Sequence, residues 1–289
     1  MPRTLDTALL ANDLRKLAQL FSRPVFAGLA QGRLPEFARG ARELVCGSSS
    51  VPMADVLQCA YKRLTLSFRS EYIYKNEIAS KIVFARHSPR TASLVSELRT
   101  GQSILDVAVF NGTSTAYEIK TEYDTLARLP DQLRDYMRIF DKVNVVTYGP
   151  AVDGVLRIVP NDVGVMVLTD RGSLSTVKEA TSDMSRLDLD GLFNVLRRSE
   201  YLRILERTHQ WDGLVPRGRL FAEAKALFCE LEQEVAHAEA VTELRRRTTD
   251  ATTADFVRSL PTSVRLLGLS EALSGIGQER LTAALFEHV

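Results

Sequence analysis

The sequence predicts an α/β protein in which a group of short strands lies between two helical regions. Segments of β character cluster in the middle of the chain, whereas residues at helical spacing dominate both ends. The turn sequence Asn111-Gly112-Thr113 separates two of these segments and is typical of a hairpin loop. The expected order is helix, three-strand antiparallel meander, helix, strand and strand. The strands are expected at 94–99, 104–110, 116–121, 143–149 and 163–169, with a last short one at 175–178.

Helical patterns flank these strands on both sides. Leucines at helical spacing predict an N-terminal helix, namely Leu5, Leu9, Leu10, Leu14, Leu17 and Leu20. Further helices are expected at 53–64, at 69–84 with Ser70 as N-cap, and at 129–140. Beyond residue 185 the chain turns helical again over 188–208 and, as one long helix, over 219–247, before a weakly patterned tail. We therefore expect three regions: an N-terminal helical segment (1–65), a core (66–182) and a C-terminal helical region (183–289).

Composition and charge exclude several classes of protein. The chain has 289 residues, of which 45% are hydrophobic and 25% charged, as in an ordinary globular protein. No run approaches the roughly 20 apolar residues of a membrane span, and no signal-peptide pattern begins the chain, so we expect a cytoplasmic location and no membrane partner. The net charge of +1 argues against a protein coated in nucleic acid but allows a local basic groove. Cys46, Cys59 and Cys229 are odd in number and widely spaced, which favours three buried, reduced thiols.

The hairpin around Asn111–Thr113 brings two acidic residues together. A three-residue loop there places Asp106 directly opposite Glu118 on the neighbouring strand. Because side chains alternate along a strand, Glu118 and Lys120 share the face of Asp106, while Val107, Val109, Tyr117 and Ile119 point the other way. Two carboxylates and an amine are therefore expected to converge.

This arrangement suits a divalent cation and a phosphate. Mg²⁺ is usually held by one or two carboxylates together with water and substrate phosphate, which Asp106 and Glu118 can provide. A lysine two residues along can orient a water molecule or stabilise charge that develops on the phosphate. The alternative is a cross-strand ion pair on a solvated sheet face, worth roughly 0.2–1 kcal/mol. We disfavour it because the neighbouring strands are too apolar for a solvated meander.

Asp106 followed by Glu118-Ile119-Lys120 resembles the signature of the PD-(D/E)XK nuclease superfamily, although Leu105 stands where the motif name has proline. The segment Gln132-Leu-Arg-Asp-Tyr136 is similar to the QxxxY element of RecB-like members. The resemblance covers roughly residues 70–180, which are also similar to an uncharacterised bacterial family. It implies a restriction-endonuclease-like core of helix, three antiparallel strands, helix and strand, with helical additions at both ends.

The same resemblance implies site residues. Asp106, Glu118 and Ile119 would hold Mg²⁺ or Mn²⁺, and Lys120 would act at the phosphate. Gln132 and Tyr136 would face the active site or the DNA. Many members add an acid from the helix before the meander. Glu77 is the best match and Glu71 the second, with exposed helix surface as the alternative for Glu77.

Other motifs favour simpler interpretations. Glu223-Ala224-Lys225 repeats the Glu-x-Lys pattern, but on a helix residues two apart point in different directions and cannot share a site. The four histidines have no ligand spacing and are expected to be structural or exposed: His87, His209, His237 and His288. Glu122 and Asp124 are expected to begin a loop.

The helix near residues 192–207 is a candidate nucleic-acid surface. It holds four arginines, Arg197, Arg198, Arg203 and Arg207, with Trp211 following. Arg203 and Arg207 share a face, so a stripe that contacts phosphates is one interpretation. A solvated surface, with Glu200 and Glu206 pairing locally, is the other. Arg245–Arg247 are expected to complement the dipole of the long helix.

Together these patterns predict a nuclease, that is, a Mg²⁺- or Mn²⁺-dependent phosphodiesterase that cleaves DNA in a bacterial cytosol. A role in defence against mobile DNA, or in its maintenance, is implied by family analogy alone. One alternative is a non-catalytic binding or regulatory module that retains the fold and engages a protein partner or a second copy through its helical arms. Another is a nuclease acting on RNA. Because Glu118 is expected to be a metal ligand on a strand surface and not a core contact, Glu118→Ala should leave folding little changed while metal binding and cleavage are lost.

Overall fold

The computed structural model describes residues 11–289, which fall into two compact units. One unit is helical and comprises the chain up to Lys81, the short segment Asp170–Ser173 and the C-terminal segment Thr252–Val289. The other contains the sheet and comprises Ile82–Thr169 and Leu174–Ala251. Each unit is assembled from segments far apart in the sequence, so the units do not coincide with the three consecutive regions expected above.

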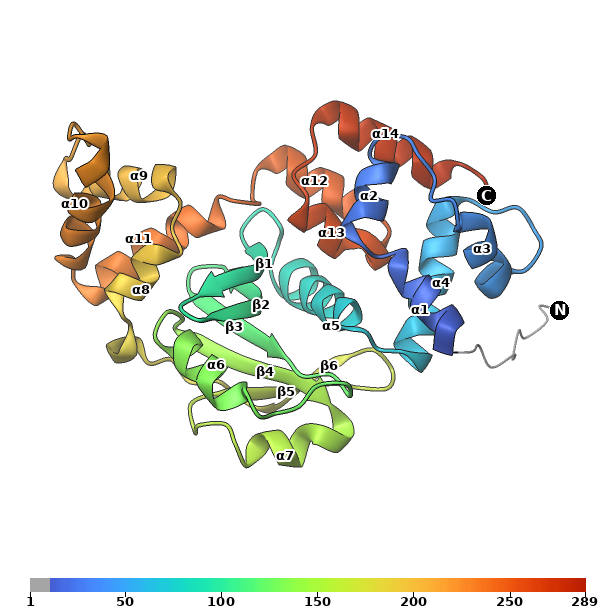
Figure 1. Cartoon of the computed structure of the whole chain (residues 1–289), viewed down its shortest axis with the longest axis horizontal. Helices are drawn as coiled ribbons and strands as arrows, with labels where there is room; N and C mark the ends of the chain where they lie inside the picture. Colours follow the sequence, from blue (N-terminus) through green and yellow to red (C-terminus); the bar gives the residue numbers. More distant parts are fainter. Residues whose placement is uncertain (1–10) are drawn as a thin grey trace. The chain divides into compact units, whose positions relative to one another are not determined.

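The helical unit joins the first and the last helices of the described chain, coloured blue and red in Figure 1. Leu14, Leu17 and Leu20 are buried in it, whereas Leu5, Leu9 and Leu10 lie outside the described residues. The tail that seemed weakly patterned is helical, and α14 packs against α2 and α4. The helices of this unit are α1 (Ala11–Gln19), α2 (Arg23–Leu29), α3 (Ala38–Cys46), α4 (Met53–Ser67), α5 (Glu71–Ile78), α12 (Ala251–Ser259), α13 (Arg265–Ser270) and α14 (Gly275–Phe286).

The helix expected at 69–84 is present in two forms. Ser70 is the N-cap residue of α5, although its side chain makes no capping hydrogen bond. From Ala79 to Arg86 the chain continues as a π-helix, η1. The side chain of Asn76 ties α5 to the C-terminal segment, because it donates to the carbonyl of Thr262 at 2.9 Å and accepts from the amide of Leu266 at 3.1 Å.

The second unit is built on a six-stranded mixed sheet in the order β1-β2-β3-β4-β5-β6. The first three strands form the predicted antiparallel meander, β4 lies parallel to β3, β5 lies parallel to β4, and β6 returns antiparallel. The expected strands are all present, with small shifts of their ends. Their bounds are β1 (Ser93–Thr100), β2 (Ser103–Phe110), β3 (Ser114–Ile119), β4 (Lys142–Tyr148), β5 (Gly164–Leu168) and β6 (Leu174–Lys178).

Helices cover the sheet and share one apolar core with it. The buried core contains residues of the central strands and of every α-helix that follows the meander in this unit, among them Tyr136, Phe193 and Phe228. Helix α11 packs against β1 and β2, and α6 packs against β2 and β4. These helices are α6 (Leu129–Met137), α7 (Val152–Leu156), α8 (Leu189–Asn194), α9 (Arg198–His209), α10 (Arg217–Cys229) and α11 (Gln233–Arg245).

The prediction of one long helix over 219–247 is wrong. The chain breaks at residues 230–232 into α10 and α11, and the stretch 188–208 likewise breaks between α8 and α9. The breaks let the chain fold back, so that Phe193 and Phe228 meet at 5.5 Å between ring centroids while Ala236 and Ala240 of α11 enter the same core. The stabilisation from burying these apolar side chains therefore outweighs the helix propensity of the residues at the break.

The cysteines and the helices of the described chain bear on two further expectations. The three cysteines are free, as predicted, but they are not buried: Cys59 and Cys229 are exposed and Cys46 is half-buried. None of the helices within residues 11–289 has the length and apolar character needed to traverse a membrane.

Candidate active site

The β2–β3 hairpin has the predicted register. Its ladder pairs Phe110 with Ser114 at the loop and Val107 with Tyr117 at the other end, and one further step places Asp106 across from Glu118. At that step the Asp106 side chain takes part in the pairing, because its Oδ2 accepts a hydrogen bond of 2.7 Å from the amide of Ile119. The carboxylate of Asp106 is thereby fixed at the edge of the Glu118-Ile119-Lys120 segment.

Glu118 is the centre of a hydrogen-bonded cluster. The ammonium of Lys120 donates to Glu118 Oε1 at 2.7 Å, and the hydroxyl of Tyr136 donates to Glu118 Oε2 at 2.7 Å. Lys120 also donates to Gln132 Oε1 at 2.8 Å, while Gln132 Nε2 lies 3.5 Å from the Tyr136 hydroxyl. Four side chains from β3, its C-terminal end and α6 therefore form one connected polar group.

Local structure explains why α6 contributes to this cluster. Gln132 and Tyr136 are four residues apart, so they share one face of α6. The main chain of Lys120 is held on β4, because its amide donates to the carbonyl of Val146 and its carbonyl accepts from the Thr147 hydroxyl. The helix face and the strand end are each fixed by backbone pairing, and their polar side chains meet.

The cluster is buried in an otherwise apolar sheet. Glu118 is 1% exposed and Lys120 7%, and every residue of β3 is buried. The solvated cross-strand ion pair considered above is therefore excluded. Burial, together with the negative charge of Glu118, raises the pKa of the Tyr136 phenol far above its ordinary value. Both effects favour the protonated phenol, which is the form that donates to Glu118.

The donor set fits a hard divalent cation. Asp106 and Glu118 offer two carboxylates, and Ile119, whose side chain is hydrocarbon, can offer only its main-chain oxygen. Two carboxylates completed by water are a common way in which proteins hold Mg²⁺. Within residues 11–289 no three His, Cys, Asp or Glu side chains gather as a cage for a metal, so a cation here would depend on water or substrate for its other ligands.

Glu77 and Glu71 belong to the helical unit and have partners there. Glu77 is buried, not exposed, and accepts a hydrogen bond of 2.8 Å from Tyr61. Burial raises the pKa of the Glu77 carboxyl, and the Tyr61 bond and the charge of Lys81 oppose that rise. Glu71 forms an ion pair with Lys75.

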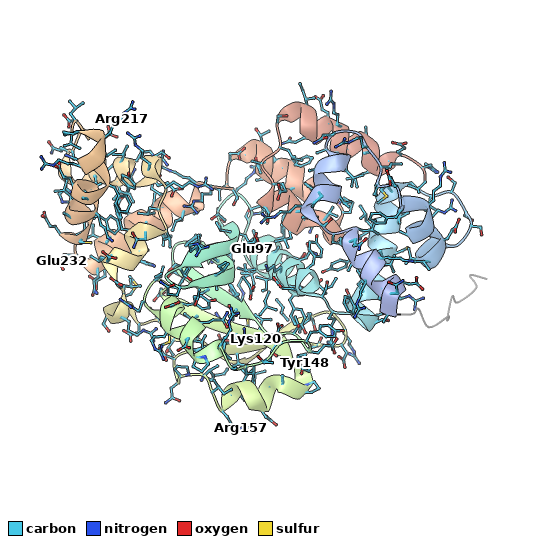
Figure 2. The ribbon with its side chains drawn as sticks, in the orientation of Figure 1. Glu97, Lys120, Tyr148, Arg157, Arg217 and Glu232 are labelled. Atoms are coloured by element: carbon cyan, nitrogen blue, oxygen red, sulfur yellow. The ribbon has the colours of Figure 1, made fainter. Side chains whose placement is uncertain are left out.

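The arginines of α9 are largely engaged by acids on α11. Arg203 and Arg207 share a face, as predicted, and both bind Glu243, while Arg207 also binds Glu239. Arg197 and Arg198 are exposed. Glu200 does not pair only locally: it accepts from the Arg197 amide at 2.7 Å and also binds Arg247 across the fold at 2.6 Å. Arg247, whose side chain is 8% exposed, is therefore an ion-pair partner and not simply a complement to the helix dipole. Figure 2 shows Lys120 well apart from Arg217 and Glu232. Arg217 is the first residue of α10, and Glu232 is the N-cap residue of α11.

A second buried polar group, which the sequence did not predict, joins α11 to the hairpin. The Ser114 hydroxyl lies 2.8 Å from His237 Nε2 and accepts from the amide of Asp141 at 3.0 Å. Burial lowers the pKa of His237, and the charge of Asp141 opposes that effect. Because Ser114 is 2% exposed, this Ser-His-Asp set serves as a tie between elements and offers no accessible nucleophile. His237 lies 123 residues from Ser114 in the sequence, so no local spacing could have revealed it.

The fold and the site define a mixed α/β protein with a buried carboxylate–lysine cluster at the edge of its meander. Residues 65–261 match the model of the family described as Bacteriophage P4 protein cII, and the chain belongs to this family. Protein cII of Enterobacteria phage P4 is 37% identical over 68 residues, which is 24% of this chain and 26% of that protein. The chain thus matches about a quarter of the length of this curated relative. No solved structure matches the chain.

Proposed function

We propose that the Glu118 cluster is the active site of a metal-dependent nuclease, within a core of the restriction-endonuclease type. The observation that carries the proposal is the convergence of four buried polar side chains, Glu118, Lys120, Gln132 and Tyr136, beside Asp106. Buried charged groups are costly unless they are paired, and they often mark functional sites. Apolar residues at these positions would often give a sheet equal or greater stability, so stability alone does not explain the polar cluster.

The order of the elements supports this core. Helix α5 and η1 precede an antiparallel meander, α6 follows it, and β4 lies parallel to β3. The resemblance to PD-(D/E)XK nucleases implies this order of helix, three antiparallel strands, helix and strand. Asp106 and the Glu118-Ile119-Lys120 segment lie on β2 and β3 at adjacent positions, as that motif requires.

Each residue of the cluster has a defined task in phosphodiester hydrolysis. Asp106 and Glu118 would hold the cation, and the Ile119 carbonyl would be a further ligand. A bound Mg²⁺ or Mn²⁺ supplies acidity to a water molecule and neutralises charge on the scissile phosphate. Lys120 stabilises the negative charge that develops on the phosphate oxygens. Tyr136 holds the second oxygen of Glu118 in place, and Gln132 positions the Lys120 ammonium.

DNA is the substrate we favour, and a role in defence against or maintenance of mobile DNA follows only by analogy. One observation favours the non-catalytic alternative, a binding module that retains the fold. Both oxygens of Glu118 already accept hydrogen bonds, one of them from a cation, so the cluster is satisfied without a metal. Because a carboxylate oxygen has two lone pairs, the same contacts leave each oxygen able to accept one more ligand.

A cleavage assay with a matched control tests the proposal. The purified protein is incubated with supercoiled DNA, linear DNA, single-stranded DNA and RNA, with Mg²⁺, with Mn²⁺ or with a chelator. We expect metal-dependent cleavage that is lost in Glu118→Gln and retained in Glu223→Gln. Cleavage of RNA alone would make the protein a ribonuclease. If the wild type cleaves none of these substrates and calorimetry detects no divalent cation, the binding module is the correct interpretation.

A further inference from the structure

We propose that a pocket on α6, distinct from the Glu118 cluster, binds a small organic anion with an apolar body and one anionic head group. The pocket has a volume of about 470 Å³, within the roughly 300–1,000 Å³ typical of small-molecule sites. It lies entirely within the sheet-containing unit, between α6, the segment after α7 and the segment before α8. Its lining residues are Pro130, Leu133, Arg134, Met137, Arg138, Ile158, Pro160 and Arg186.

The lining combines an apolar floor with a cationic rim. Leu133 is buried, Met137 is half-buried and Ile158 is 37% exposed, so the floor presents hydrocarbon to solvent. Three arginines belong to the lining, and no acidic residue does. Burial of an apolar group against the floor would contribute binding free energy, and a negative charge on the ligand would form charge-assisted hydrogen bonds with the arginines. The chemistry thus selects an amphipathic anion over a neutral apolar compound or a cation.

Acids outside the lining hold these arginines in place. Arg134 binds Asp131 at 2.8 Å and Arg138 binds Asp188 at 2.6 Å. Arg186 pairs with Asp162 and, at 3.4 Å, with Asp183. The Arg134 and Asp131 side chains are mostly exposed, and exposed ion pairs of this kind contribute only about 0–1 kcal/mol. A guanidinium has five N–H donors, so it can keep such a partner and still donate to a ligand.

A neighbouring pocket provides the comparison. It has a volume of about 210 Å³ and shares Arg138, but its lining contains two arginines, Arg99 and Arg138, and two acids, Asp135 and Asp188. Its charges balance within the lining, and its smaller size leaves little room for an apolar body. Of these two pockets, the larger one therefore presents arginines without acids in its lining, and the acids that pair with these arginines lie outside the lining.

The inference does not rest on the proposed function. Leu133 and Met137 each follow a residue of the Glu118 cluster by one position on α6, so they point about 100° away from Gln132 and Tyr136. A ligand in the pocket would contact the helix on a different face from the cluster. Its binding can therefore be measured whether or not the protein cleaves nucleic acid.

Fluorescence of 8-anilinonaphthalene-1-sulfonate, an aromatic sulfonate, tests the proposal directly. The full chain is titrated with this probe and, separately, with N-phenyl-1-naphthylamine, which has the same rings and no charge. We expect saturable binding of one sulfonate probe per chain and binding of the neutral compound weaker by at least about tenfold. Decanoate should displace the probe, whereas inorganic phosphate, which has no apolar body, should not.

Two variants and two controls locate the site. Arg134→Glu reverses a charge on the rim, and Ile158→Asp places a charge on the floor, so each should weaken binding of the probe by at least about tenfold. Arg219→Glu is the control for Arg134→Glu, because each arginine forms an ion pair with an acid about one helical turn away. Val177→Asp is the control for Ile158→Asp, because Val177 is 46% exposed and Ile158 is 37% exposed. Circular dichroism establishes that all four variants are folded.

The proposal is overturned if the wild type does not bind the probe or binds the neutral compound equally well. It is also overturned if Arg134→Glu and Ile158→Asp, both folded, bind the probe as tightly as the two controls do. Displacement by phosphate alone would show that the site is a simple anion site and would contradict the role assigned to the apolar floor.

Discussion

The chain contains the pattern Glu-x-Lys twice, and the two copies differ in what surrounds them. On β3 and its end, Glu118 and Lys120 point the same way, and their charged groups meet at 2.7 Å. On α10, Glu223 pairs with Arg219 and Lys225 pairs with Asp190, so the two side chains turn to different partners. Strand alternation brings residues two apart together, and helical rotation separates them. The same three-residue pattern thus forms one internal ion pair in the first element and two separate ion pairs in the second.

Stability should show the largest difference between the two copies. Glu118→Ala leaves the Lys120 ammonium buried without its carboxylate, which is expected to cost about 3–5 kcal/mol of unfolding free energy. Glu223→Ala removes a partly exposed pair and should change stability by about 0–1 kcal/mol. Urea unfolding of both variants measures the difference. Similar losses would mean that Lys120 reaches solvent when Glu118 is removed.

This expectation corrects the one drawn from the sequence. Glu118 is not on an exposed strand surface, so Glu118→Ala cannot serve as a variant that alters activity and leaves folding unchanged. Glu118→Gln, which preserves shape and one acceptor oxygen, is the better probe of function. The correction follows from the burial of all of β3, which its sequence of mixed polar and apolar residues did not reveal.

Activity provides the second comparison. If the cluster is catalytic, Lys120→Gln should slow cleavage by about 10²–10³-fold, because charge stabilisation at the phosphate is lost. Binding of Mg²⁺ should be largely retained, since an ammonium is not a ligand. Lys225→Gln should leave both properties unchanged. Cleavage rates and calorimetry, both measured on protein shown to be folded, provide the readouts, and an unaffected rate in Lys120→Gln would remove this residue from the mechanism.

Tyr136→Phe should have a smaller effect on stability. The substitution removes the hydroxyl that donates to Glu118 at 2.7 Å and keeps the ring in the core. Hydrogen bonds to charged groups contribute about 1.5–3 kcal/mol, so a loss of that size is expected in urea unfolding. Tyr201→Phe is the control, because Tyr201 is also a buried core tyrosine and has no hydrogen bond to a carboxylate among the interactions described for it. Equal losses in the two variants would show that the Tyr136–Glu118 bond contributes no specific stabilisation.

The sequence predicted the parts of this fold that depend on near neighbours. The register of the β2–β3 hairpin follows from a three-residue loop and from strand alternation, and it is confirmed. The meeting of Gln132 and Tyr136 with Lys120 also follows a local rule, the shared face of a helix, combined with a resemblance. Residue roles in catalysis remain predictions, because geometry alone does not establish a reaction.

What the sequence missed depends on contacts between distant segments. The break at residues 230–232 contains no glycine or proline, and it becomes understandable only from the packing of α10 and α11 around Phe228. Glu200 and Arg247 are 47 residues apart and form a part-buried pair, which adds to the local hydrogen bond between Glu200 and the Arg197 amide. The exposure of Cys59 and Cys229 likewise depends on which helix faces find partners.

Glu77, like Glu118, is a buried acid, but its hydrogen bond comes from a neutral donor, Tyr61. Burial raises the pKa of its carboxyl above the ordinary value of 4.5, so the unfolded chain releases this proton at a lower pH than the folded chain does. Between these two pKa values the unfolded state binds fewer protons, and the free energy of unfolding therefore falls as the pH rises.

Glu77→Gln keeps an acceptor for Tyr61 and abolishes the titration. We expect this variant to be more stable than the wild type at pH 7 and to lose the advantage at pH 4, in thermal unfolding followed across that range. A wild-type protein whose stability rises from pH 4 to 7 by the same amount as that of Glu77→Gln would show that burial does not penalise the charge of Glu77.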